Sequence, residues 1–431
     1  MDEKPVQILF LDHTAVLSGA ELSMLNLVQR LDAARFVPTV LLFADGPLVG
    51  ALREAGVAVE VLPLADAVRG AGRGSLGVGS LAKLGAIFTS AAFMLRLARY
   101  IRAAKPDIVH CNSLKADVLG GLAARLAGVK VIWHIHDRIE TDYLPATVVK
   151  VFRFLLRHIP HSVIANSQGT LETLKLPQGK RWAVVYPCVP AIAGKKLEVR
   201  SSKLEDNASR QVYPAGQNES AALPHSNSYL LTPNFSGTTT KDFVVVLVGR
   251  ISPWKGQDVF IRAAAIVLKQ FPACRFQIVG SALFGEDALL GQLQQLAVSL
   301  GVADRVEFLG FRKDIPEIIA ASTLLVHAST TAEPFGQVIV QAMVESKPVV
   351  ATRGGGVLEI VEDGKTGLLV PMKDVDAMAK AIGELLADPV RARKMGEAGR
   401  ARFLEKFTIE QTVREVERVY GSMTNDGEFR S

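Results

Sequence analysis

The chain has 431 residues, of which 49% are hydrophobic and 21% are charged. This composition excludes a disordered or fibrous protein, and the length exceeds what one domain with a single hydrophobic core usually holds. The net charge of +6 arises in residues 1–194, which hold 21 Lys and Arg against 15 Asp and Glu, whereas the remainder holds 28 of each. This half is therefore expected to face an anionic partner (a membrane, a lipid phosphate or a nucleic acid), although scattered solvated charges give the same modest excess.

Three cysteines, Cys111, Cys188 and Cys274, stand apart from one another and form no CxxC pair and no cluster with histidine. Their spacing predicts neither a disulfide framework nor a metal site and is typical of a reducing compartment. The N-terminus is acidic ahead of a short apolar run, which is the wrong order for a secretory signal. We expect a cytoplasmic protein whose basic half could rest peripherally on the inner face of the cytoplasmic membrane.

Short apolar runs alternate with helical segments throughout residues 1–193. This alternation predicts a mostly parallel sheet with helices on both faces. A Gly-rich, basic stretch at 69–80 is expected to be a mobile loop. The predicted strands are 6–11, 37–43, 57–62, 107–110, 130–135, 162–165 and 182–186, and the principal predicted helices are 20–31, 81–102, 114–127 and 147–158.

Residues 194–241 are rich in Ser, Asn, Pro and charge, which predicts a disordered insertion that also links two domains. A second alternation follows over 242–407, and residues 408–431 are predicted to form a helix that packs back on the first domain, then a tail. The expected fold class is α/β, with two Rossmann-like doubly wound domains facing a cleft. The later predicted strands are 243–248, 275–279, 305–309, 323–327 and 348–351, and the later predicted helices are 257–270, 287–300, 313–320, 374–386, 389–407 and 409–422.

The helix predicted at 81–102 has to be considered as a membrane element. Its uncharged run, 84–95, is too short to span a bilayer, and basic residues flank it. It could lie on anionic lipid as an interfacial helix, or it could cover the sheet with its basic end in water. We favour burial against the sheet, with surface contact left to its ends.

Glu333 lies between an apolar strand at 323–327 and a helix that follows Gly336. In open α/β sheets, ligands bind at this end of the strands. The carboxylate can accept hydrogen bonds from hydroxyl groups, and unpaired amides at the helix start can hold an anion. The segment therefore suits a sugar attached to phosphate, although a carboxylate that merely caps the helix explains it equally well.

Two cations follow the first strand of the second half. Arg250 comes directly after the strand and Lys255 just before the next helix. A guanidinium fork and an ammonium five residues apart can clamp a diphosphate. Two loop cations in solvent would give the same pattern, and Glu333 at the same sheet edge favours phosphate binding.

The N-terminal half carries weaker signals. Gly19, within Ser18–Glu21, permits close approach of a ligand to helix amides, but the segment is neither a dinucleotide fingerprint nor a P-loop. His134 and His136 lie at the end of the strand predicted at 130–135, and a hydrogen bond to substrate or a structural role suits them better than a metal site.

Two further motifs lie in the second half. Asp374-Val375-Asp376 looks like the DxD metal motif found in some sugar-transferring enzymes, but it opens a predicted helix, where Asp is a favoured cap. We therefore expect no bound metal. The glycines at 354–356 follow a strand and could cradle a phosphate or a sugar oxygen.

In combination, these motifs resemble the retaining glycosyltransferases of family 4, which have the GT-B fold. The resemblance covers nearly the whole chain outside 194–241. It implies that the first domain faces the acceptor and the second binds a nucleotide sugar, with the two cations on its diphosphate and the carboxylate on its sugar. The donor residues assigned in this way are Gly19, Arg250, Lys255, Glu333, Phe335, Gly336, Gln337 and Gln341, and the catalytic assignments are His136, with His134 as second choice, Glu333, Arg250 and Lys255.

One position departs from the family pattern. Gln341 stands where the family usually has a second Glu, bound to the nucleotide ribose. An amide can still bond ribose hydroxyls, but without charge, so weaker bonds and an altered donor affinity are expected.

The resemblance implies a metal-independent retaining transferase that moves a hexosyl group from a nucleotide sugar, without a further cofactor. A glycan or lipid-linked acceptor in cell-envelope or exopolysaccharide synthesis is the expected partner. The alternatives are a non-catalytic sugar-nucleotide-binding protein, which Gln341 favours, and a GT-B-like epimerase or phosphorylase. A nucleic-acid binder is not expected, because basic and aromatic residues do not interleave.

Overall fold

The structure is a computed structural model that describes residues 4–64, 80–189, 243–282 and 286–424. Residues 69–79 of the predicted Gly-rich loop and the whole predicted insertion, 194–241, lie outside these ranges. The domain boundaries drawn from the sequence therefore stay a prediction.

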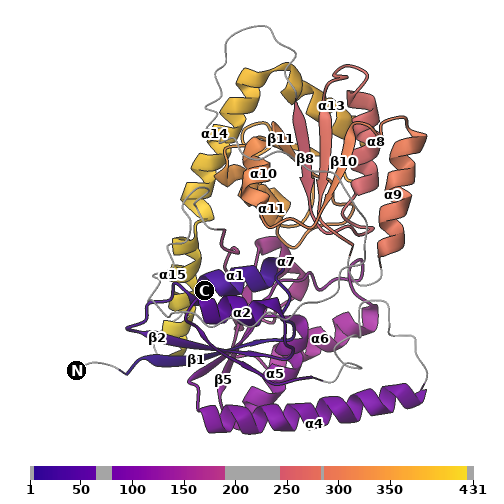
Figure 1. The fold of residues 1–431 in the computed structure, drawn as a ribbon. Coiled ribbons are helices and arrows are strands. Elements are labelled where there is room, and N and C mark those ends of the chain that lie inside the picture. Colours follow the sequence, from indigo (N-terminus) through magenta and orange to yellow (C-terminus); the bar gives the residue numbers. More distant parts are fainter. Residues whose placement is uncertain (1–3, 65–79, 190–242, 283–285, 425–431) are drawn as a thin grey trace, which may run out of the picture. The chain divides into compact units, whose positions relative to one another are not determined.

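The first sheet has seven parallel strands in the order β3-β2-β1-β4-β5-β6-β7 (Figure 1). Helices cover both of its faces, which explains why its central strands read as continuous apolar runs. The strands are β1 (Val6–Asp12), β2 (Phe36–Leu42), β3 (Ala58–Val61), β4 (Ile108–Cys111), β5 (Lys130–Ile135), β6 (Ser162–Ala165) and β7 (Arg181–Val184).

Three helices form one layer on this sheet, namely α4 (Ser80–Ala104), α5 (Leu114–Ala127) and α6 (Ala146–His158). Their inward side chains, among them Leu97 and Phe152, share a core with Trp133 of β5. From residue 90 onward, where its side chains are described, α4 packs Leu97 against the sheet and exposes Arg96 and Arg99, so the favoured interpretation of 81–102 is confirmed for this stretch.

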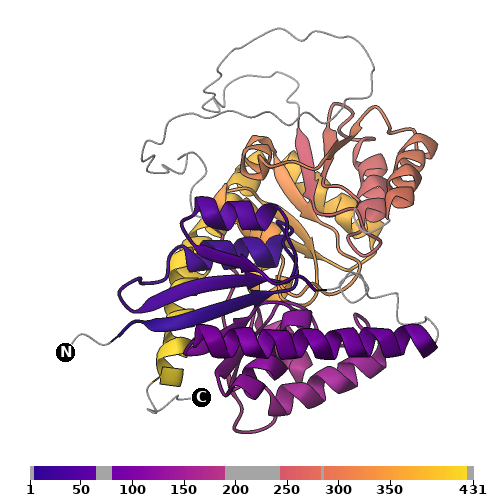
Figure 2. The ribbon, with the colours of Figure 1, turned by 60° about the horizontal axis from the view of Figure 1, so that its bottom comes forward.

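The opposite layer is made by α1 (Gly19–Val28), α2 (Pro47–Glu54) and the C-terminal helix α15 (Ile409–Thr424). Figure 2 shows the strands of the first sheet between its two helical layers. Val416 and Tyr420 of α15 are fully buried in the same core as Phe10 of β1. The last helix of the chain thus completes the hydrophobic core of the first sheet.

The second sheet has six parallel strands in the order β10-β9-β8-β11-β12-β13. Its strands are β8 (Val244–Val248), β9 (Arg275–Val279), β10 (Val306–Gly310), β11 (Leu324–His327), β12 (Val349–Thr352) and β13 (Leu368–Val370). Its helices are α8 (Gln257–Val267), α9 (Asp287–Ser299), α10 (Ile315–Ala321), α11 (Gln337–Val344), α12 (Val357–Ile360), α13 (Val375–Ala387) and α14 (Pro389–Lys406).

The predicted α/β class with two doubly wound sheets is confirmed. In each sheet the strand order reverses once: strands are first added on one side of the first strand and then on its other side. The reversal lies between β1 and β4 in the first sheet and between β8 and β11 in the second, and ligands bind beyond the strand ends at such switch points. Two short elements, α7 (Gln168–Leu174) and β13, are absent from the sequence prediction. In the described ranges, none of the helices combines the length and apolar character needed to cross a membrane.

Candidate active site

The carboxylate of Glu333 lies beyond β11 among polar groups from several segments. Its Oε1 accepts a hydrogen bond from Lys255 Nζ at 2.6 Å and another from the Ser329 hydroxyl, and it lies 3.6 Å from His327 Nε2. Burial acts to raise the pKa of Glu333, but Lys255 and His327 outweigh it and hold that pKa well below its usual range. Glu333 is therefore ionised. It does not cap α11, whose N-cap is Gly336 with a φ of 115°.

Of the glycines at 354–356, Gly355 and Gly356 lie against the backbone of residues 333–335. The Gly356 N–H donates to the Glu333 carbonyl at 3.0 Å, and a Cβ on Gly355, which has a φ of 60°, would stand 2.0 Å from that carbonyl oxygen. These glycines therefore allow the loop after β12 to press on the segment that carries Glu333.

The loop between β8 and α8 carries Arg250 and Lys255. A Cβ on Gly256 would lie 2.0 Å from the Ala328 carbonyl oxygen, so this loop packs directly on the end of β11. The Arg250 guanidinium stands 5.1 Å from the Trp254 ring centroid, an arrangement that holds the side chain by a cation–π contact. The loop thus brings Lys255 to Glu333 and keeps Arg250 on the same turn.

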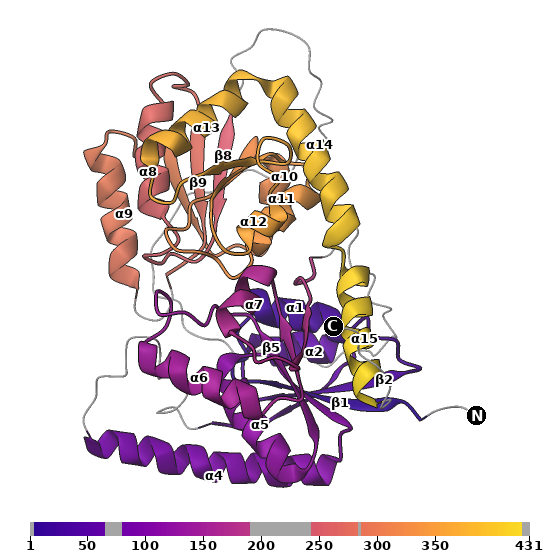
Figure 3. The ribbon, with the colours of Figure 1, turned by 180° about the vertical axis from the view of Figure 1, so that it is seen from behind.

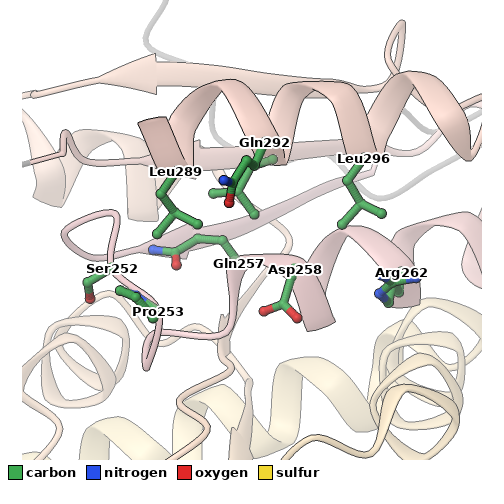
Figure 4. Close-up of a pocket in the computed structure, with 9 residues that line it drawn as sticks. Ser252, Pro253, Gln257, Asp258, Arg262, Leu289, Gln292 and Leu296 are labelled. Atoms are coloured by element: carbon green, nitrogen blue, oxygen red, sulfur yellow. The ribbon is translucent and has the colours of Figure 1, made fainter. Parts of the chain in front are cut away.

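A pocket of about 410 Å³ opens behind this loop, between α8 and α9. Figure 4 shows Gln257 and Asp258 of α8 across from Leu289 and Leu296 of α9. Arg250, Lys255 and Glu333 are not among the residues that line this pocket. It is therefore distinct from the polar cluster at the end of β11.

At the end of the first sheet, hydrogen bonds join three segments. Asn112, which follows β4, donates from Nδ2 to Asp12 Oδ2 at 2.9 Å, and its Oδ1 lies 3.0 Å from His136 Nε2. Because an amide oxygen can only accept, His136 donates from Nε2. Burial lowers the pKa of His136 to about 4 against the opposing influence of Asp137 and Asp12, so this imidazole is neutral at pH 7 with Nδ1 able to accept.

The two other histidines of this region lie deeper. His134 is buried and stacks on His136, with ring centroids 4.2 Å apart. Its Nδ1 lies 3.1 Å from His110 Nε2, and His110 Nδ1 lies 2.7 Å from the Tyr420 hydroxyl of α15. His134 and His110 therefore belong to the interior, and His136 is the histidine that stands at the strand ends.

Gly19 is the first residue of α1, one position before the predicted start of this helix, and a Cβ there would come within 2.6 Å of Gln337 Oε1. The N-cap hydroxyl of Ser18 donates to Glu21, which is buried. Burial and the nearby Asp12 raise the pKa of Glu21 to about 7, against a weaker influence of the Ser18 bond. The start of α1 therefore holds a carboxyl that titrates near neutrality.

Other predicted positions have plainer surroundings. Phe335 is buried, with its ring centroid 5.6 Å from that of Tyr186 and 6.0 Å from that of Phe407, so its side chain packs in the core. Gln341 lies one turn beyond Gln337 on α11 and is half-buried. Asp374 accepts a hydrogen bond from the Ala377 N–H at 2.9 Å, which confirms that it caps α13.

Sequence reasoning missed several residues at these two clusters. His327 ends β11 and Ser329 follows it, and both contact Glu333. Asp12 ends β1 and Asn112 follows β4; Asp12 accepts a hydrogen bond from Asn112, which in turn holds His136. The signal that could have found them is shared: each is a polar residue directly after a buried apolar run, at the strand ends where parallel sheets bind ligands.

Two family models match the chain, Glycosyltransferase Family 4 over residues 17–191 and Glycosyl transferases group 1 over residues 232–402. Together they contain every residue assigned to the donor site from the sequence. The chain belongs to the family 4 type of glycosyltransferase. As such a glycosyltransferase it is an enzyme of the GT-B fold, and the two sheets are the two Rossmann-like sheets of that fold.

Similar proteins agree with this assignment. EpsD of Bacillus subtilis (strain 168), which is named as a glycosyltransferase, is 28% identical over 333 residues, 76% of this chain and 79% of EpsD. A GDP-mannose-dependent alpha-(1-6)-phosphatidylinositol monomannoside mannosyltransferase of Mycolicibacterium smegmatis is 40% identical over 165 residues, but these make up 36% of this chain and 42% of that protein.

Solved structures resemble the glycosyltransferase over nearly its whole length. HepE of Anabaena, in complex with UDP and glucose, has a TM-score of 0.75 and 27% identity, and the match covers 97% of this chain and 100% of that chain. Sucrose-phosphate synthase from Thermosynechococcus elongatus has a TM-score of 0.71 at 18% identity, covering 98% and 100%, and this likeness supports the fold alone.

Proposed function

We propose that this glycosyltransferase moves a hexosyl group from a nucleotide sugar to a glycan or lipid-linked acceptor, with retention at the anomeric carbon and without a metal. The observation that carries the proposal is the contact between Lys255 and an ionised Glu333 at the switch point of the second sheet. A cation suited to phosphate and a carboxylate suited to sugar hydroxyls stand side by side there, as a phosphorylated sugar requires.

The leaving group sets the demand on the cations. When the bond between the anomeric carbon and the phosphate oxygen breaks, negative charge develops on the nucleoside diphosphate. Arg250 and Lys255 would neutralise this charge in place of a metal. The acceptor oxygen forms the new bond, and its proton passes to the departing phosphate oxygen, so no further reactant is needed.

Glu333 is better suited to binding than to attack. Its Oε1 already accepts from Lys255 and Ser329, and its depressed pKa marks a stabilised and therefore weakly nucleophilic carboxylate. We assign it to the hydroxyls of the donor sugar. His136, neutral and fixed through Asn112, would accept a hydrogen bond from a sugar hydroxyl at Nδ1.

Names of similar proteins support the donor and acceptor classes. HepE has been solved with UDP-glucose, and the mannosyltransferase is named for GDP-mannose and a phosphatidylinositol monomannoside acceptor. We therefore propose a nucleotide-activated hexose as donor, a lipid-linked glycan as acceptor, and a cytoplasmic enzyme that works peripherally on the membrane in envelope or exopolysaccharide synthesis.

The direct test is product analysis. The purified protein is incubated in EDTA with UDP-glucose or GDP-mannose and lipid-linked glycans, and the product is analysed by NMR. We expect an α-linked hexosyl product from an α-linked donor, and at least a tenfold slower reaction for Lys255→Ala, which removes a charge-assisted bond to phosphate. A β-linked product, or activity that EDTA abolishes, would contradict the proposal.

Gln341 favours a second candidate, a non-catalytic sugar-nucleotide-binding protein. On this alternative, Gln341→Glu would bind nucleotide more tightly but neither protein would turn it over. On our proposal, the wild type transfers sugar, and Gln341→Glu changes donor affinity by roughly threefold to tenfold because a ribose hydroxyl then meets a charged acceptor. Calorimetry and product formation, measured on both proteins, separate the two candidates.

A further inference from the structure

The layer formed by α4, α5 and α6 has an uneven charge. These three helices hold nine Lys and Arg but only one acidic residue, Asp117, which is fully buried. Residues 80–106 and 143–171 contain no Asp or Glu at all. In Figures 1 and 3, the three helices lie together along one face of the first sheet. The charge excess of the N-terminal half therefore includes a helical face without exposed carboxylates.

The outward face of α6 is also apolar. Val151 is 58% exposed and Phe154 is 62% exposed. Lys150 and Arg157, both exposed, flank them at helical spacing. His158 lies beside the ring of Phe154, with centroids 5.0 Å apart. An aromatic ring and a branched aliphatic side chain thus project between cations, while Phe152 and Leu156 of the same helix fill the core.

α4 repeats this pattern. Leu95 is 52% exposed and is followed on the same face by Arg96, Arg99 and Arg102, which are all exposed. Leu126 at the end of α5 is 48% exposed, and the Arg102 guanidinium donates to its carbonyl, which ties the ends of α4 and α5 together. Each helix of the layer therefore carries an exposed apolar side chain with a cation nearby in sequence.

Two carboxylates in the segment before α6 are already engaged. Glu140, in the loop before α6, accepts from Arg153 at 2.7 Å, and Asp142 pairs with Arg138 at 3.4 Å. The two carboxylates are therefore paired with other residues and do not neutralise Lys150 and Arg157 on the outward side of α6. Glu60 of β3 reaches α4 through a bond to Tyr100, and the described outward side chains of α4 and α6 themselves include cations but no carboxylate.

We propose that this face, made by the outward side chains of α4 and α6, docks on an anionic lipid leaflet. Val151, Phe154 and Leu95 would enter the headgroup and upper acyl region, and the cations would meet lipid phosphates. Charge complementarity selects anionic lipid, and the projecting aliphatic and aromatic groups favour a bilayer over a nucleic acid. The inference deepens the proposed function, on which it rests, by naming the surface at which a lipid-linked acceptor is met.

Vesicle co-sedimentation tests the proposal on the full chain. The probe is vesicles of phosphatidylcholine with or without phosphatidylglycerol, at low and at high salt. The wild type is expected to sediment with the anionic vesicles only, and high salt is expected to release it. Val151→Asn with Phe154→Asn should weaken binding roughly tenfold by removing the inserting groups, and Lys150→Gln with Arg157→Gln should weaken it at least as much.

A matched control exists on the second half. Phe311 and Val390 are each 65% exposed, and Phe311→Asn with Val390→Asn should leave vesicle binding unchanged. Equal binding by the α6 double variant and the wild type would overturn the proposal, as would binding to single-stranded DNA but not to vesicles. Circular dichroism shows whether each variant is folded, and the charge variant tests the same surface independently of the apolar one.

Sugar transfer is measured in parallel, with a water-soluble acceptor and no vesicles. A protein that binds anionic vesicles but transfers no sugar contradicts the proposed function and leaves the docking face standing. A protein that transfers sugar but ignores vesicles contradicts the docking face alone. With lipid-linked acceptor in vesicles, the α6 variants should raise the apparent KM for the acceptor and leave the rate with soluble acceptor unchanged.

Discussion

Lys255 Nζ lies 2.6 Å from Glu333 Oε1, and this ion pair places a cation and a carboxylate together beyond the strand ends of the second sheet. Both side chains are largely buried, at 28% and 13% exposure, so the pair is weakly screened by solvent. The Ser329 hydroxyl donates to the Glu333 carboxylate and His327 lies beside it. Lys255 gives one N–H to this carboxylate and keeps further N–H donors for a phosphate. Each member of the pair is thus already ordered before a donor binds.

Removing the charge of Glu333 separates sugar recognition from phosphate recognition. Glu333→Gln should lower kcat/KM for the nucleotide sugar roughly 100-fold, because charge-assisted bonds to the sugar are lost. Affinity for the nucleoside diphosphate without sugar should be kept or improved, because Lys255 is then released to the phosphate. Steady-state kinetics and calorimetry measure the two effects, with Glu384→Gln, a half-buried position on α13, as control. A parallel loss of diphosphate affinity would show that Glu333 supports phosphate instead.

Glu21 gives donor binding a pH dependence. With its pKa raised to about 7, the carboxyl is neutral below that pH and charged above it, close to Gly19 where we place the donor phosphates. Donor affinity should therefore fall as pH rises from 6 to 8. Glu21→Gln, which stays neutral, should abolish this change, and calorimetry at both pH values checks it. Equal pH dependence in both proteins would remove Glu21 from the site.

Individual residues differ in how far the sequence predicts their surroundings. Arg250, Lys255 and Glu333 stand in a motif, so their placement beyond β8 and β11 follows from the strand pattern. Ser329 could not be selected, because nothing in a short polar loop shows which hydroxyl will turn toward a carboxylate. Phe335 sits inside the motif, yet its ring packs in the core, since motif membership does not report side-chain direction.

Among the elements, α15 is joined to the first sheet by a buried chain of hydrogen bonds as well as by apolar packing. Tyr420 meets His110 of β4, which in turn meets His134 of β5. Burial lowers the pKa of His110 to about 3, with a smaller contribution from His136, so this side chain is neutral in the folded protein and protonated in the acid-unfolded one.

The sign of the resulting pH effect follows from linkage. The folded pKa of His110 lies below its unfolded value of 6.5, so its neutral burial is tolerated above pH 6.5 and costs stability as pH falls toward 3. His110 alone should lower the free energy of unfolding by about 2 kcal/mol between pH 7 and pH 5. His110→Gln should make the measured decline in urea unfolding shallower by about that amount. An unchanged slope would mean that His110 is not buried neutral.

α7 depends on a residue far away in the chain. The Glu359 carboxylate accepts from the Gln168 and Gly169 amides at 2.8 Å each, at the positive end of the helix. α7 was missed by sequence reasoning because its seven residues include Gly169 and two β-branched threonines, which are poor helix formers, and because the Glu359 part of its support is distant, although its N-cap, Ser167, is local. β13 was missed because a strand of three residues is too short to show a hydrophobic pattern.

Glu359→Gln tests this dependence. The amide keeps the shape but loses charge, and we expect about 1 kcal/mol lower stability together with faster hydrogen exchange at Gln168 and Gly169. Chemical denaturation and amide exchange measure the two effects. Glu397→Gln on the exposed side of α14 serves as the control. Unaltered exchange at both amides would show that α7 holds its own N-terminus.

For the whole molecule, the sequence predicted the two parallel sheets because alternation of apolar runs and helices leaves few other topologies. It also predicted that 409–422 forms a helix, although only the structure shows how α15 completes the core against β1 and β4. Segment 194–241, which interrupts the alternation, lies outside the described residues. The sequence predicted the basic residues of the docking face on α4 and α6, but only the structure shows that Phe154 is exposed beside them.

Calorimetric titration in EDTA tests the central claim, that Lys255 and Glu333 form a metal-independent nucleotide-sugar site, most directly. Wild type and Lys255→Ala are titrated with UDP-glucose, GDP-mannose and the corresponding diphosphates, with Lys394→Ala, an exposed position on α14, as control. We predict that one nucleotide series binds the wild type at one site per chain and binds Lys255→Ala at least about tenfold more weakly. No binding by the wild type, or equal binding by Lys255→Ala, would contradict the claim.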